Sequence, residues 1–357
     1  MRKFMIFISI LTSLPLFFSC SHADNLLEEY EVEVEHTIAD TTKNSTQNDT
    51  IIQHDTTILN GDTIVHTDTI VKTDTIVKTD TTKENIKVSY EKYMRITPTY
   101  GTAQGAACYG KYFIQGYSSN GALGIYDLEK KQAICKLDIP APAASSKTHA
   151  NTINFGNERF SPDDFFPLLY VSSGYTKQIN GSQCSSIYVY RICKYDNSDG
   201  SEGFHIEFVQ TINLKGFGSW TEGIIDNDQN ILWIKYEPNG TNGEYRYASF
   251  TLPKLEDGDI TISKEEAITD FSLGKQPFTS SNQGHLYYDN RILLVSGTSF
   301  KTQKIAFIVI NTLTHTRELV IDLAEIGLTS EPENVFIYNN QLMIGYQGSI
   351  YKFNVHQ

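Results

Sequence analysis

The sequence has no run of basic residues, and its formal net charge is −13. A nucleic-acid-binding surface needs clustered lysine and arginine to neutralise phosphates, so the sequence excludes nucleic acid as a partner. The negative charge is also unevenly placed. Residues 21–85 carry 14 acidic and 4 basic side chains, whereas residues 86–357 carry 28 and 23. Most of the acidity therefore belongs to the N-terminal segment.

Cysteine is scarce, and its spacing carries no metal motif. In an exported chain the four cysteines beyond Cys20 permit two disulfides in three possible pairings, and free, partly buried thiols are equally compatible with the sequence. The chain has no C-x-x-C pair and no cysteine flanked by histidine, so we expect neither a metal nor a cofactor. The four cysteines are Cys108, Cys135, Cys184 and Cys193.

The N-terminus carries a short apolar run. Arg2 and Lys3 precede the apolar residues 4–18, and Ser19 and Cys20 follow. A run of this length with these flanks is typical of a secretory leader and is too short to span a bilayer. It resembles the lipoprotein signal peptides of bacteria, although aromatic residues stand where the commonest lipobox has others. A plain secretory leader is the alternative.

The lipoprotein resemblance implies a location. Residues 1–19 would be removed, and Cys20 would carry the lipid, palmitate among its acyl chains, so that the protein is anchored to the membrane without spanning it. We therefore expect an outer membrane lipoprotein of the cell envelope, either periplasmic or surface-exposed.

Residues 20–85 form a low-complexity spacer rich in threonine and aspartate, with Asp-Thr-Ile-Val-x-Thr repeated across residues 62–82. A segment with so few aromatic residues cannot bury enough apolar surface to offset its ordering entropy, so we expect a disordered stalk. A left-handed β-helix is the alternative, but about four clean hexads are too few to bury a core.

The spacer also carries a repeated tripeptide. Asp-Thr followed by Ile or Thr occurs seven times before residue 85 and is absent from residues 86–357. It resembles the acceptor of Bacteroidota-type O-glycosylation, whereas the alternative is a linker that grew by duplication. The resemblance implies glycans on Thr41, Thr50, Thr56, Thr63, Thr69, Thr75 and Thr81.

Residues 86–357 have short β-type runs and turn clusters but no sustained helical period, which predicts an all-β domain. Five units resemble one another, beginning near residues 102, 148, 221, 282 and 332. In each, a polar anchor precedes a short strand, a turn and an apolar strand, as in TEGIIDNDQNILWIKY (221–236). A third strand follows in every unit, and a fourth follows in all but the last.

The strand at residues 84–96 has no partner of its own and can supply the missing fourth strand of the last unit. Four-stranded units in radial repetition, closed by a terminal strand, are similar to a β-propeller. We therefore predict a five-bladed, monomeric β-propeller head closed by its N-terminal strand. A β-sandwich and a six-bladed ring are the alternatives.

The five anchors predict a candidate binding site, because the inner strands of a propeller begin at one mouth of its axial channel. Aromatic and amide side chains near that mouth suit sugar rings, and loop lysines favour an anionic ligand. The alternative is that the anchors only satisfy one another's hydrogen bonds. The candidate ligand-binding residues are Gln104, His149, Glu222, Gln283 and Glu333, with Tyr117, Tyr175 and Trp220 beside them.

Three functions follow from this arrangement. The first is a binding module that recognises a carbohydrate or a partner protein. The second is a hydrolase or lyase acting on a glycan, with Glu222, Glu333 and His149 as acid and base. The third is an envelope scaffold for other proteins. No nucleophile elbow, phosphate loop or H-E-x-x-H motif is present, which favours a binding protein over an enzyme.

One further resemblance concerns the starts of the blades. The pairs Gln104-Gly105, Glu222-Gly223 and Gln283-Gly284 look like the blade starts of glutamine cyclotransferases, which are also five-bladed propellers. The residue that usually follows is leucine, and here it is replaced, so shared blade geometry accounts for the likeness without shared chemistry.

Overall fold

The computed structural model describes residues 29–40, 44–59, 62–77, 80–118, 121–140, 150–172, 177–179, 182–218, 221–238, 244–275, 282–298 and 304–356. Within these ranges, side chains are described from residue 86 onward. The exceptions are the side chains of residues 177–179, 182–184, 275 and 282. Cys20, Thr41, His149, Tyr175 and Trp220 therefore lie outside the described residues. So do the side chains of the other six threonines expected to carry glycans.

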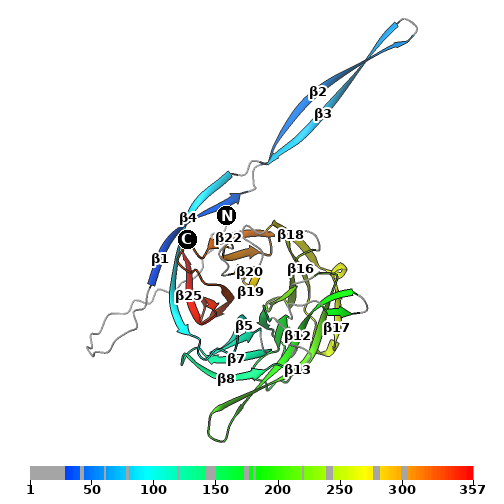
Figure 1. The fold of residues 1–357 in the computed structure, drawn as a ribbon. Coiled ribbons are helices and arrows are strands. Elements are labelled where there is room, and N and C mark those ends of the chain that lie inside the picture. Colours follow the sequence, from blue (N-terminus) through cyan, green and yellow to red (C-terminus); the bar gives the residue numbers. More distant parts are fainter. Residues whose placement is uncertain are drawn as a thin grey trace.

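Five antiparallel sheets lie around a common axis, so the chain is a five-bladed β-propeller as the repeats predict (Figure 1). The first blade contains β5 (Ala103–Tyr109), β6 (Tyr112–Tyr117), β7 (Ala122–Asp127) and β8 (Gln132–Asp138). The second contains β9 (Ile153–Phe155), β10 (Leu169–Ser172), β12 (Ser182–Asp196) and β13 (Glu202–Lys215), with the short β11 (Lys177–Ile179) beside β12.

The next two blades follow the same order from the axis outward. The third contains β14 (Glu222–Asp226), β15 (Ile231–Tyr236), β16 (Glu244–Thr251) and β18 (Thr269–Lys275). The fourth contains β19 (Asn282–Tyr288), β20 (Arg291–Ser296), β21 (Ala306–Asn311) and β22 (Thr316–Asp322). One strand changes sheets: β17 (Ile260–Ser263) pairs in parallel with β13 of the second blade. Two 3-10 turns, η1 (Leu255–Asp257) and η2 (Lys264–Glu266), flank it.

The fifth blade is closed from the N-terminal side. It contains β23 (Pro332–Tyr338), β24 (Gln341–Tyr346) and β25 (Ser349–His356), and β25 pairs with β4 (Asp80–Arg95). This confirms the predicted closing strand. The ends of β4 and β25 lie side by side in Figure 1.

The segment before β4 differs from the expected disordered stalk. β1 (Glu29–Asp40) pairs with β4 as a fifth strand of the last blade, and β2 (Asn44–Leu59) forms a long hairpin with β3 (Asp62–Val77) that projects from the head (Figure 1). The threonine, isoleucine and valine of the repeats have high strand propensity, and two hexad segments of equal period pair without a mismatch. The hairpin is also distinct from the β-helix considered above.

Buried apolar residues form one cluster at each junction between neighbouring blades. Ile114 and Val171 belong to the cluster between blades one and two, and Ile225 and Ile187 to the one between blades two and three. Comparable clusters join the remaining blades, including one between blades five and one. Because successive strand residues point to opposite faces, each inner strand contributes to two junctions. The ring is therefore held by hydrophobic contacts on both faces of every blade.

The turns after the inner strands of the last two blades use two residues with positive φ. Asp289 and Asn290 have φ of 49° and 58°, and Asn339 and Asn340 have 49° and 60°. Such pairs are the signature of the type I′ turn, whose twist matches that of a tight hairpin. These turns place the ends of β19 and β23 at the same face of the ring.

Candidate functional site

Four of the five anchors lie at the starts of inner strands, and all four are buried. The exposed fractions are 4% for Gln104, 1% for Glu222, 6% for Gln283 and 1% for Glu333. Of the aromatic residues predicted beside them, Tyr117 is fully buried and its hydroxyl is hydrogen-bonded to that of Tyr126. Tyr117 is therefore a core residue that offers no face to a ligand.

The anchors occur where the inner strands bulge and approach one another. The pairing register shifts near the start of the first, fourth and fifth inner strands, and bulges of this kind re-aim side chains. A Cβ added to Gly284 would lie 2.6 Å from Cα of Asn334, and one added to Gly105 would overlap the carbonyl oxygen of Asn151. The recurring Gln-Gly dipeptide thus has a packing cause: only glycine lets neighbouring inner strands come this close.

Glu222 is the centre of a buried polar group, which we call the axial cluster and which draws on three blades. One carboxylate oxygen lies 2.9 Å from Nδ1 of His285 on β19. Thr152 donates to the same oxygen at 3.2 Å, and the side-chain amide of Asn151 donates to the other at 3.3 Å. Lys235, the cross-strand partner of Glu222 on β15, is buried beside it. The axial cluster is Asn151, Thr152, Glu222, Lys235 and His285.

The axial cluster holds its carboxylate ionised. Burial by itself raises the pKa of Glu222, but the nearby Lys235 and His285 outweigh it and bring the pKa below its usual value. Burial lowers the pKa of Lys235, and the charge of Glu222 opposes that change. The ammonium group lies 4.5 Å from the ring centre of Tyr245, which adds a cation–π contact. A buried carboxylate thus lies beside two basic side chains, Lys235 and His285.

Glu333 has the opposite environment. Burial, followed by the charge of Glu331, raises its pKa to about 8, although a hydrogen bond from Gln347 lowers it. The amide of Gln347 donates to one carboxyl oxygen at 2.6 Å. Glu331 in turn accepts a bond from Gln283 at 2.7 Å. The ring therefore contains two buried glutamates that differ in protonation near neutral pH.

Four groups near the axis keep a polar atom without a hydrogen-bond partner among the described residues: Oε1 of Gln104, Nε2 of His285, Oε2 of Glu333 and Oδ1 of Asn334. Buried polar atoms of this kind are usually satisfied by internal water. Because the four described anchors are almost fully buried, their contacts indicate a role in holding the inner strands together.

An open pocket lies at the other end of the inner strands, where the chain turns from the first strand of each blade into the second. Its volume is about 280 Å³, and all five blades contribute to its lining. We call it the axial pocket. Its lining includes residues 106–109, 153–157, Arg159, Pro167, Ile225, Asn227, 286–288, Phe336 and Ile337.

Sequence reasoning missed His285, Lys235 and the axial pocket. The signal for His285 was a histidine at an apolar position of an inner strand, in the segment NQGHLYY. The signal for the axial pocket was the aromatic residue that recurs before the first turn of a blade, as at Tyr109 and Tyr288. His149 lies outside the described residues, so its expected place at the channel mouth stays a prediction.

Comparison with known proteins finds only weak similarity to solved structures. No family model matches the sequence, and no curated protein does. Glutaminyl cyclase from Myxococcus xanthus is similar at 11% identity and a TM-score of 0.39, over 74% of this chain and 94% of that one. Hydrazine synthase from Kuenenia stuttgartiensis matches at 10% identity and a TM-score of 0.36, over 68% and 61%.

The computationally designed protein Ika8 is similar at 11% identity and a TM-score of 0.32, over 73% of this chain and 98% of that one. The blade-start dipeptides resemble those of glutamine cyclotransferases, and the structure has weak similarity to one glutaminyl cyclase. At these TM-scores none of the three carries an argument about function. The class of this protein, a five-bladed β-propeller, rests on its own strand pairing.

Proposed function

We propose that this protein is a lipid-anchored binding module of the cell envelope that takes a carbohydrate into the axial pocket. The observation that carries the proposal is the lining of that pocket by aromatic rings and amide groups from five blades. Aromatic faces stack on the CH faces of sugars, and a few convergent polar groups fix the orientation of a ligand in an apolar pocket.

The aromatic part of the axial pocket comes from Tyr109, Phe155, Tyr287, Tyr288 and Phe336. Tyr288 is 49% exposed, so its ring is available at the rim. Flat rings on several sides suit a ligand with two apolar faces. A pyranose ring has that shape.

Two asparagine side chains in the lining of the axial pocket each keep one polar atom without a hydrogen-bond partner among the described residues. Asn154 accepts a bond from the backbone of Ile225 at 3.1 Å, while its Nδ2 is buried and has no partner among the described residues. Asn227 donates to the carbonyl of Phe155 at 3.0 Å, and its Oδ1 is likewise buried without a partner. One donor and one acceptor of the lining thus stay unpaired among the described residues, and an outward turn of either amide would present it to a sugar hydroxyl, which both donates and accepts.

Arg159 gives the axial pocket a positive charge. Its guanidinium donates to the hydroxyl of Tyr109 at 2.6 Å and to the carbonyls of Asp164 and Phe165. Among the described residues it forms no salt bridge, although the charge of the nearby Asp164 interacts with it. This charge supports an acidic sugar over a neutral one, and a volume of about 280 Å³ fits one or two rings rather than a long chain.

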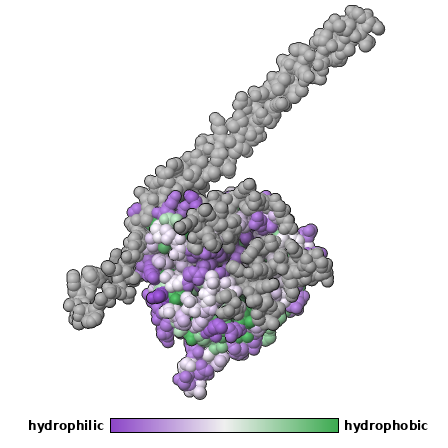
Figure 2. All heavy atoms as spheres, viewed as in Figure 1, coloured by the Kyte–Doolittle hydropathy of each residue, from purple (hydrophilic) through white to green (hydrophobic). Residues whose placement is uncertain are grey.

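The envelope location rests on the sequence: the leader at residues 1–19, Cys20 as the lipid acceptor, and the glycosylated spacer that would hold the head away from the membrane. No helix among the described residues is long and apolar enough to cross a bilayer. In the view of Figure 2 the described surface of the head is mainly hydrophilic, with smaller hydrophobic areas.

A hydrolase or lyase is the second candidate, and one observation favours it. Glu222 is ionised while the pKa of Glu333 is raised to about 8, which is the division of roles between a base and an acid. Against it, both carboxyls are almost fully buried, and Glu222 is engaged by His285 and Thr152. The axial pocket is open, whereas the two carboxyls are buried, so the arrangement favours a binding module over an enzyme.

Glycan-array binding followed by calorimetry tests the proposal, with Tyr288→Ala as the pocket variant. Tyr195→Ala is the matched control, because Tyr195 is also a tyrosine, is 47% exposed and lies outside the axial pocket. We expect Tyr288→Ala to weaken binding at least about tenfold, corresponding to 1.4 kcal/mol, while Tyr195→Ala leaves it unchanged.

If both variants bind the glycan as tightly as the wild type does, the ligand does not bind in the axial pocket. Release of a shortened glycan would instead support the hydrolase or lyase. If the protein binds no glycan but captures another envelope protein, the scaffold function would be supported.

A further inference from the structure

The second blade extends into a long hairpin, formed by β12 and β13, that projects beyond the rest of the ring (Figure 1). On it the structure brings together three side chains with metal-binding atoms, which we call the hairpin cluster: Cys193, His205 and Glu207. We propose that the hairpin cluster is a zinc site with three protein ligands and an open fourth position. This site is separate from the axial pocket and does not depend on the proposed carbohydrate function.

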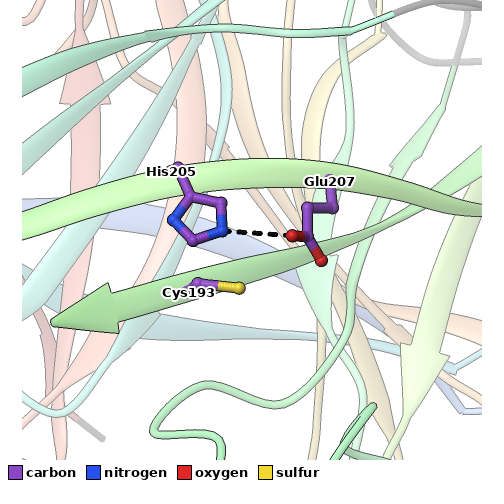
Figure 3. A group of neighbouring side chains, drawn as sticks. All are labelled: Cys193, His205 and Glu207. Carbon is purple, nitrogen blue, oxygen red and sulfur yellow. Dashed lines mark hydrogen bonds and ion pairs between the residues drawn. The ribbon is translucent and has the colours of Figure 1, made fainter.

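The strand register creates the hairpin cluster. Cys193 on β12 is paired directly with His205 on β13, and Glu207 follows two residues later on the same face of the strand. Directly paired residues have Cβ atoms about 4.5–5.5 Å apart, and alternate residues share a face. Figure 3 shows the sulfur of Cys193 turned toward the carboxylate of Glu207, which lies beside the imidazole.

The distances are close to those of a coordinated ion. Nε2 of His205 lies 3.1 Å from a carboxylate oxygen of Glu207, and the three donor atoms all lie within 4.8 Å of one another. Tetrahedral zinc with bonds of about 2.0–2.3 Å to nitrogen, oxygen and sulfur requires its donors to be about 3.3–3.8 Å apart. Small side-chain rotations therefore suffice, and the backbone of the paired strands need not move.

The surroundings hold the carboxylate and balance the charge. Arg191 lies 3.2 Å from the second oxygen of Glu207, which leaves the first oxygen for a metal. The other nitrogens of Arg191 are bound by Asp164, at 2.9 Å and 2.6 Å. Asp164 therefore offsets the positive charge of Arg191, and Arg191 orients Glu207 in the way that outer partners orient metal ligands.

The donor set selects the kind of metal. One thiolate, one imidazole and one carboxylate suit a borderline ion such as zinc, whereas magnesium and calcium prefer oxygen ligands alone. Binding converts the thiol of Cys193 to a zinc thiolate and releases one proton to solvent. With three protein ligands, the fourth position is left for water or for a group from a ligand or partner.

The other described cysteines do not share this arrangement. Cys108 and Cys135 are free thiols like Cys193, but in the described part of the chain neither belongs to a group of three metal-binding side chains. They are therefore matched controls for a thiol that is present but does not bind metal.

Cobalt substitution in the purified, untagged protein tests the site, because a cobalt–thiolate bond produces a charge-transfer absorption band and histidine or carboxylate ligands alone do not. We expect the wild type and Cys108→Ser to bind one cobalt ion with this band, and added zinc to abolish it. Cys193→Ser should lose the band entirely. His205→Ala should weaken zinc binding at least tenfold in competition with a chromophoric chelator.

Two results would overturn the site: absence of the band in the wild type, or its persistence in Cys193→Ser. Unchanged zinc affinity in His205→Ala would exclude the histidine as a ligand and with it the proposed donor set. All three substitutions lie outside the axial cluster, and equal thermal midpoints of the metal-free variants would show that any loss of binding is not a loss of fold.

Discussion

Replacing Glu333 by glutamine should change how the stability of the ring depends on pH. In the folded protein the pKa of Glu333 is raised to about 8, whereas the ordinary value is 4.5. Between these two values the folded state keeps a proton that the unfolded state releases. Rising pH therefore favours unfolding of the wild type. Glutamine has nearly the same shape, can still accept the bond from Gln347 and does not titrate.

The size of the effect follows from that pKa difference. Each pH unit between the two values lowers the free energy of unfolding of the wild type, relative to the variant, by about 1.4 kcal/mol. From about pH 5 to about pH 7 the two proteins should therefore diverge by about 3 kcal/mol, with the variant the more stable at the higher pH. Near pH 4.5 the two should be about equal.

Denaturant titrations at several pH values measure this directly. Glu256→Gln is the matched control, because Glu256 is an exposed glutamate whose side chain is 75% accessible. The control should keep the pH dependence of the wild type. If Glu333→Gln and the wild type stay parallel across this range, Glu333 is ionised in the folded protein and the argument from burial fails.

Three further outcomes follow from the packing. Glu222→Ala leaves the buried Lys235 without its counter-charge and His285 without its carboxylate partner, so it should lower the free energy of unfolding by about 3–5 kcal/mol, measured by denaturant titration. Gly284→Ala should cost about 1–3 kcal/mol by forcing two inner strands apart, while Gly348→Ala, with nothing within 4 Å of the new Cβ, should be close to neutral in the same assay. A chain beginning at residue 86 should fold cooperatively in circular dichroism, whereas one beginning at residue 97 lacks β4 and should not.

The number of blades was predictable because it rests on local patterns. Each inner hairpin repeats a short strand, a turn and an apolar strand, and turns such as Asn339-Asn340 carry a conformational signal that does not depend on distant contacts. The closing strand was predictable because the last unit lacked its fourth strand and the strand at residues 84–96 belonged to no other unit. Strand formation in the spacer was missed because composition alone does not decide whether two repetitive strands pair.

The site was predictable only in part, because its contacts join distant parts of the chain. The anchors could be found as a repeat, but the pairing of Glu222 with His285 follows from how blades three and four meet. The hairpin cluster depends on the register of β12 against β13, which no spacing within either strand reveals. The unusual pKa of Glu333 likewise arises from burial and from Glu331, both consequences of ring closure.

The closure of the ring by β4 has a consequence for folding. Ser89 on β4 contacts His356 on β25 at 3.0 Å, although 267 positions separate them. A contact over such a separation carries a large loop-closure cost until the intervening blades are in place, so the two terminal strands should join last. Until then each is an unprotected sheet edge able to pair with another molecule. A truncated chain that lacks β25 should therefore be prone to aggregation or strand exchange even though four of its blades are intact.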